Sequence, residues 1–231
     1  MTDRLGAGEP RGSGAEAGVR ERVREIVARD LRPVRPLLAP GRRLLLLIPI
    51  AIAAGVFAPI VYGHRDFEHL GPFATWGLSA FEWIAGLLIL AVALRHAVPG
   101  RGVSRRFVIA TLVGAPAIIL LVTIVTFFIE PTRVPPGVAF QYWFECVKWP
   151  MAIAAPVLLV ASLLAMRAFP TRPGLVGALC GLSAGVLADS GWRLACEVSA
   201  PSHVLGSHGI AVLLMAIVGC AAALAIDVVR R

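Results

Sequence analysis

Six long apolar stretches restrict the possible folds of this chain more than any other feature. They cover residues 44–62, 76–94, 107–129, 149–166, 174–192 and 209–226. Each is about as long as a helix needs to cross the hydrocarbon core of a bilayer. A soluble domain would not need apolar runs of this length, and 58% of the chain is hydrophobic. We therefore expect an all-α fold, in which residues 44–229 form a six-helix integral membrane bundle.

The basic residues predict the orientation of this bundle. Of the 22 Lys and Arg residues, ten lie in residues 1–43, four in 95–106, two in 167–173 and two at the C-terminus, so that four remain for the opposite connections. Such a bias is typical of cytoplasmic segments, and it predicts that both termini are cytoplasmic. Nearly all the basic residues are arginine, which indicates a GC-rich bacterial genome, and hence a multi-pass protein of the bacterial inner membrane. The net charge of +8 thus reflects topology, and we expect no direct nucleic-acid binding.

Residues 1–43 are expected to form a cytoplasmic arm. Residues 1–14 have the composition of a disordered segment. Apolar residues at helical spacing in residues 15–31 predict an amphipathic helix, and its apolar face consists of Val19, Val23, Ile26, Val27 and Leu31. This helix must end near Leu31, because Pro33 disfavours helical geometry before it. Three prolines in residues 32–40 predict an extended strap that also carries arginines.

Two cysteines are candidates for a sensor. Cys146 and Cys196 fall at the predicted outer ends of spans, where thiols can oxidise to a disulfide or bind a soft metal; the alternative is that both are unpaired structural residues. His203 and His208 follow Cys196 and add two plausible metal ligands, although the spacing matches no zinc-finger pattern and local hydrogen bonding would also explain them. The other two cysteines lie inside spans and are expected to pack as small apolar residues: Cys180 and Cys220.

Few other polar residues interrupt the spans. Glu82 lies well inside the second apolar stretch, which indicates either a proton or ion site or a packing clamp with Arg193, and we favour the clamp. Asp189 and Arg193 are spaced i, i+4 and predict a local ion pair. Small residues four apart predict a close helix contact along one face of 174–192: Gly177, Gly181 and Gly185. The chain has none of the common catalytic motifs, so we expect neither an enzyme nor a cofactor.

Two segments carry a family resemblance. The stretch "VREIVARDLRPVRPLLAPGRR", directly before the first span, resembles the cytoplasmic segment of the NrsF-type membrane anti-sigma factors. The stretch "RAFPTRPGLVGALCGLSAGVLADSGWRLAC" resembles that family's fourth connection and fifth span, which end in a cysteine. The segment "EVSAPSHVLGSHG", after Cys196, departs from the family pattern in being richer in His and Ser.

The resemblance implies a bacterial protein of six spans that holds an extracytoplasmic-function sigma factor inactive. It also implies that Cys146 and Cys196 are paired outer cysteines that sense an envelope signal, oxidant or metal. The expected partners are the sigma factor on the cytoplasmic side and the lipid bilayer. The residues expected to grip the sigma factor are Val19, Val23, Ile26, Leu31, Arg32, Pro33, Arg35 and Pro36.

Two other functions remain open from the sequence. The chain would suit a small transporter or permease subunit, with Glu82 and the proline-interrupted helices forming a substrate path. It would also suit a membrane anchor for a different cytoplasmic partner. The long amphipathic helix and the Arg-Pro strap favour the anti-sigma factor over the transporter, because a transporter has little need for them.

Overall fold

The computed structural model describes residues 13–30, 37–63, 71–131 and 136–230. The chain divides into two compact units, Met1–Pro36 and Leu37–Arg231. In the first unit, helix α1 (Ser13–Asp30) covers most of the predicted amphipathic helix. Five of the residues predicted to contact a partner lie outside the described ranges: Leu31, Arg32, Pro33, Arg35 and Pro36.

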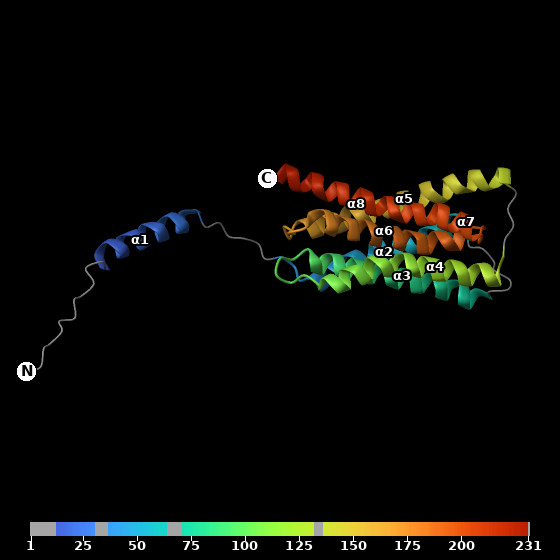
Figure 1. Ribbon diagram of the computed structural model, residues 1–231, viewed down its shortest axis with the longest axis horizontal. Coiled ribbons are helices and arrows are strands. Elements are labelled where there is room, and N and C mark those ends of the chain that lie inside the picture. Colours follow the sequence, from blue (N-terminus) through green and yellow to red (C-terminus); the bar gives the residue numbers. More distant parts are fainter. Residues whose placement is uncertain (1–12, 31–36, 64–70, 132–135, 231) are drawn as a thin grey trace, which may run out of the picture. The chain divides into compact units, whose positions relative to one another are not determined.

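The second unit consists of long helices that lie side by side (Figure 1). They are α2 (Pro40–Val61), α3 (Gly71–His96), α4 (Arg105–Ile129), α5 (Pro136–Met166), α6 (Pro173–Ala195) and α8 (Gly209–Arg230). Each is long and apolar enough to cross a membrane. The predicted all-α class and six-helix layout are therefore confirmed.

Helix α6 lies at the centre of this unit, where it packs against α8, α3, α5 and α2. In the 18-residue apolar stretch of α6, 83% of the residues are buried. In the corresponding stretches of the other five helices the buried share is 50% or less. The predicted glycine face explains this position, because Gly177 lies against Gly219, Gly181 against Met215 and Gly185 against Val212. Close approach of small residues strengthens van der Waals packing between helices in a membrane.

Two of the connections between the predicted spans are largely helical. The connection between the predicted spans 107–129 and 149–166 is shorter than those bounds imply, because α5 already begins at Pro136 and its early turns carry polar residues: Gln141, Glu145 and Lys148. The connection expected after residue 192 is also short: α6 continues to Ala195, and the chain re-enters a helix at Pro201 through α7 (Pro201–His203) and a π-helical turn, η1 (Val204–His208). Hydropathy missed these extensions because they contain polar and charged residues.

Candidate functional site

The two predicted sensor cysteines come together at one end of the bundle. Cys146 lies on α5, Cys196 directly follows α6, and their sulfur atoms are 3.6 Å apart. The Cys196 sulfur is also 3.6 Å from Nε2 of His203. With His208 these residues form a group that we call the Cys–His cluster, whose four possible ligand atoms all lie within 4.8 Å of one another. All four side chains are buried.

The π-helical turn explains why both histidines face the thiols. His203 and His208 are five residues apart, and at the 100° per residue of an α-helix they would point in directions about 140° apart. A π-helix bonds residue i to residue i+5 and so places this pair on one side. Their ring centroids are 5.7 Å apart, and the Ser207 hydroxyl donates to the His203 carbonyl within the same turn. The five-residue spacing was the only signal of this arrangement in the sequence.

The cluster has dimensions that suit a soft metal ion. Tetrahedral coordination, with metal–sulfur bonds of about 2.3 Å and metal–nitrogen bonds of about 2.0 Å, places ligand atoms about 3.3–3.8 Å apart. The two distances of 3.6 Å, sulfur to sulfur and sulfur to His203 nitrogen, fall in that range. Thiolate and imidazole are the ligands that zinc and copper(I) prefer. In His208 the ring atom Nδ1 lies 2.6 Å from a carboxylate oxygen of Asp189, which leaves Nε2 as the possible metal ligand. Contacts of this kind orient metal-binding histidines.

The same geometry also permits oxidation. The hydrogen bond from the Cys146 thiol, with a second from His203, lowers the pKa of the Cys196 thiol well below its usual range. The thiolate is the reactive form of cysteine, so this contact favours reaction at Cys196. The two thiols are only 3% and 7% exposed, so a reagent must reach them through the protein surface.

Two pockets lead to the thiols. A pocket of about 400 Å³ is lined by both cysteines together with Tyr62, Trp149 and Trp192. The ring of Tyr62 packs at 5.7 Å from that of Trp149 and at 5.3 Å from that of Trp192. A second pocket, of about 40 Å³, reaches Cys196 from the side of α3 and α4. The larger pocket is thus the wider route for a small ion or oxidant.

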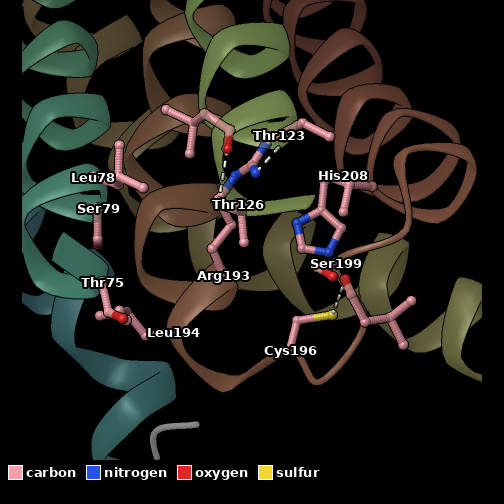
Figure 2. Close-up of a pocket in the computed structure, with 13 residues that line it drawn as sticks. Thr75, Leu78, Ser79, Thr123, Thr126, Arg193, Leu194, Cys196, Ser199 and His208 are labelled. Atoms are coloured by element: carbon pink, nitrogen blue, oxygen red, sulfur yellow. Dashed lines mark hydrogen bonds between the residues drawn. The ribbon is translucent and has the colours of Figure 1, made fainter. Parts of the chain in front are cut away.

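A buried group of charges adjoins the smaller pocket. The Nε atom of Arg193 lies 3.0 Å from a Glu82 oxygen and 2.9 Å from an Asp189 oxygen. Its terminal nitrogens donate to the Thr123 hydroxyl of α4, and Figure 2 shows Arg193 reaching Thr123, with His208 and Cys196 on one side of the pocket. The expected contacts of Arg193 with Glu82 and with Asp189 are therefore both present, and the role of Glu82 as a clamp stays a prediction. No spacing in the sequence predicts the His208–Asp189 contact, which joins the charges around Arg193 to the Cys–His cluster.

The remaining predicted residues lie elsewhere. Cys180 is fully buried in α6, and Cys220 lies partly buried in α8, away from the cluster. In the first unit, the apolar side chains of α1 are exposed: Val19 is 62%, Val23 51% and Ile26 63% accessible. The partner-binding role of these residues stays a prediction.

Comparisons with known proteins give one match. Residues 27–226 match the family described as negative regulator of sigma F, NrsF. No curated protein matches the chain, and neither does any solved structure. The match covers most of the chain, from the end of α1 to the last turns of α8, and therefore includes both the six long helices and the Cys–His cluster. The chain thus belongs to the NrsF family of negative regulators of a sigma factor.

Proposed function

We propose that this chain is a membrane-bound anti-sigma factor of the bacterial inner membrane, which sequesters an extracytoplasmic-function sigma factor through its cytoplasmic N-terminal arm. It releases the sigma factor when an envelope signal, oxidant or soft metal, reaches Cys146 and Cys196. The observation that carries this proposal is the contact between these two thiols inside a buried cluster with His203 and His208. With both termini in the cytoplasm, the cluster lies at the periplasmic end of the bundle.

The arm supplies two kinds of contact for the sigma factor. The exposed face of Val19, Val23 and Ile26 suits a hydrophobic groove, as amphipathic helices do in many complexes. Arg32 and Arg35 of the strap suit an acidic surface, because charge complementarity favours the encounter and fixes the register.

The arm is tested by reversing charge in the full-length protein. Arg32→Glu together with Arg35→Glu should release the sigma factor and switch on its target genes without any inducer. Arg4→Glu together with Arg11→Glu changes the arm's charge equally and should leave repression intact. Binding of the purified full-length protein to the sigma factor should weaken in added salt, since exposed charges are screened within about 8 Å at physiological ionic strength. Full repression by the strap double mutant, at normal membrane levels, would contradict the role of these arginines.

The cluster offers two chemistries. In oxidation, the two thiols lose two protons and two electrons to an oxidant and form one S–S bond. In metal binding, the thiols lose their protons, and His203 and His208 complete a four-ligand site. Either event replaces a loose contact between α5 and the end of α6 with a strong link.

A variant without the two histidines distinguishes metal binding from oxidation. A His203→Ala, His208→Ala variant should bind zinc or cadmium at least 10-fold more weakly, because two of four ligands are lost, yet still form a disulfide with diamide. His96→Ala is the control. His96 is the last residue of α3 and does not belong to the Cys–His cluster, so this variant should bind metal like the wild type. If the double variant retains wild-type metal affinity, the histidines are not ligands; if the wild type binds no metal, oxidation is the remaining signal.

The contacts of the buried charges, and the small size of the pocket beside them, favour a regulator over the alternative of a transporter. Among the described residues, Glu82 and Asp189 both contact Arg193. The pocket beside them measures about 40 Å³, which holds a water molecule or two rather than a transported solute. This supports a structural clamp, and the family supports a regulatory rather than a catalytic role.

A further inference from the structure

Arg43 connects the start of α2 with the end of α5. It is 3% exposed, although it carries a charge. Its Nε donates to the carbonyl of Leu38, two residues before α2 begins, at 2.7 Å. Its Nη1 donates to the carbonyl of Leu164, in the last turn of α5, at 3.2 Å. One side chain therefore ties the segment that leads from the arm to the far end of the helix that carries Cys146.

A carbonyl in the last turn of α5 explains why residue 43 is an arginine. The last four carbonyls of a helix have no partner within it. In α5 the backbone N–H groups of Arg167, Ala168 and Phe169 satisfy three of them, those of residues 163, 165 and 166. Leu164 supplies the fourth, and Arg43 donates to it. The guanidinium addresses the two carbonyls with two separate atoms, Nε and Nη1, held in a rigid plane, whereas a lysine would have to reach both carbonyls from one nitrogen.

Two prolines allow helix α5 to change its bend between Cys146 and Leu164. Pro150 and Pro156 lack the N–H groups that would bond the carbonyls of Cys146 and Ala152, and prolines inside a helix permit bending. A groove of about 310 Å³ lies between α2 and α5 beside Pro156. The two helices thus have room to move against each other in the middle, while Arg43 joins them at the end.

We propose that α5 transmits the state of the Cys–His cluster to the cytoplasmic arm, and that Arg43 is the residue that couples the two. The inference rests on the proposed function for the nature of the signal and of the partner, but the coupling itself concerns only this chain. In the resting protein, Arg43 holds the end of the strap against α5. A bond between Cys146 and Cys196 draws the outer part of α5 toward α6, and the altered bend shifts Leu164 away from Arg43.

The size of the movement is sufficient. A disulfide has sulfur atoms about 2.0 Å apart, so the present separation of 3.6 Å must shrink by roughly 1.5 Å. At a rise of 1.5 Å per residue, the distances from Pro156 to Cys146 and to Leu164 are similar, about 15 Å and 12 Å. When α5 supplies most of this closure by bending at Pro156, both ends move by comparable amounts, on the order of 1 Å. That is enough to break a hydrogen bond that already measures 3.2 Å.

Hydrogen exchange in the full-length protein, held in lipid nanodiscs, tests the coupling directly. Diamide is the probe, because it takes the two thiol hydrogens and leaves a Cys146–Cys196 disulfide, which mass spectrometry verifies. In the wild type we expect amide exchange in residues 37–46 to become at least threefold faster after oxidation. In Arg43→Met the same amides should exchange fast before oxidation and change no further. Arg42→Met, which alters the exposed neighbouring arginine, should behave like the wild type.

The outcomes separate the coupling from the proposed function. Unchanged exchange in residues 37–46 of the oxidised wild type overturns the coupling, as does a wild-type response in Arg43→Met. If Arg43→Met does not reach the membrane, Arg43→Lys decides: it keeps the charge but has to reach both carbonyls from one nitrogen, so its response should be at most half that of the wild type. In cells, Arg43→Met should release the sigma factor without any inducer, because the contact that the signal breaks is already absent. Coupled exchange in a chain that represses no sigma factor would refute the proposed function alone.

Discussion

The close contact between α6 and α8 predicts a large effect of a single methyl group at Gly181. A Cβ atom at this position would clash with the carbonyl oxygen of Met215, and it would also lie 2.7 Å from the carbonyl carbon of Met215 and 2.9 Å from the Cα of Ala216. Ordinary contact begins near 3.4 Å, so even the carbonyl carbon would be about 0.7 Å too close. Both neighbouring atoms belong to the backbone of α8 and cannot rotate away. The two helices must therefore separate along their contact.

The cost follows from the packing that is lost. A gap of 0.5–1 Å removes roughly a quarter to a half of the dispersion energy of each facing atom pair. Overpacking a well-packed interior typically costs about 1–3 kcal/mol, and the higher helix propensity of alanine returns at most about 1 kcal/mol. We therefore expect Gly181→Ala to lower the free energy of unfolding by about 2 kcal/mol.

Unfolding of the purified protein in mixed detergent micelles, by titration with SDS, measures this change. Gly114→Ala is the matched control, because Gly114 also lies inside a helix, α4, and a Cβ atom there would meet nothing within 4 Å. The control should be neutral or slightly stabilising. Equal unfolding midpoints for the two variants would refute the reasoning that the glycine face holds α6 against α8.

Three further predictions address topology, charge and chemistry. Reporter fusions after residues 140 and 200 should be active in the periplasm and a fusion after residue 170 in the cytoplasm; a cytoplasmic reading at 140 would contradict the six-span layout. Arg193→Met should destabilise the protein by about 3–5 kcal/mol, because it leaves buried carboxylates without their cation, and adding Glu82→Gln should restore part of the loss; no restoration would mean that Glu82 and Arg193 are not energetically coupled. The Cys146→Ser variant should still bind the sigma factor but should not respond to the signal in a target-gene reporter assay. Cys180→Ala, which changes a buried thiol outside the cluster, should respond as the wild type does. A full response from Cys146→Ser would show that the signal enters elsewhere.

The sequence alone determined those features that depend on neighbouring residues in the chain. The six long helices follow from runs of apolar residues of sufficient length, and length and hydropathy are local properties. The Asp189–Arg193 pair follows from a spacing of four residues on one helix. The packing face of α6 follows from glycines at the same spacing, which lie on one side whatever the partner helix is.

Only the tertiary structure decided which of these local features meet. Apolar spans facing lipid and apolar spans facing protein have similar compositions, so hydropathy does not encode how each helix is rotated about its axis or which neighbour it touches. The contact of Cys146 with Cys196 joins residues 50 positions apart, and that of Arg43 with Leu164 joins residues 121 positions apart. Likewise the π-helical turn at Val204–His208, which aims two histidines at the thiols, has no recognised sequence pattern. The Cys–His cluster and the Arg43–Leu164 contact therefore emerge from helix packing, because that packing fixes the rotation and depth of each helix.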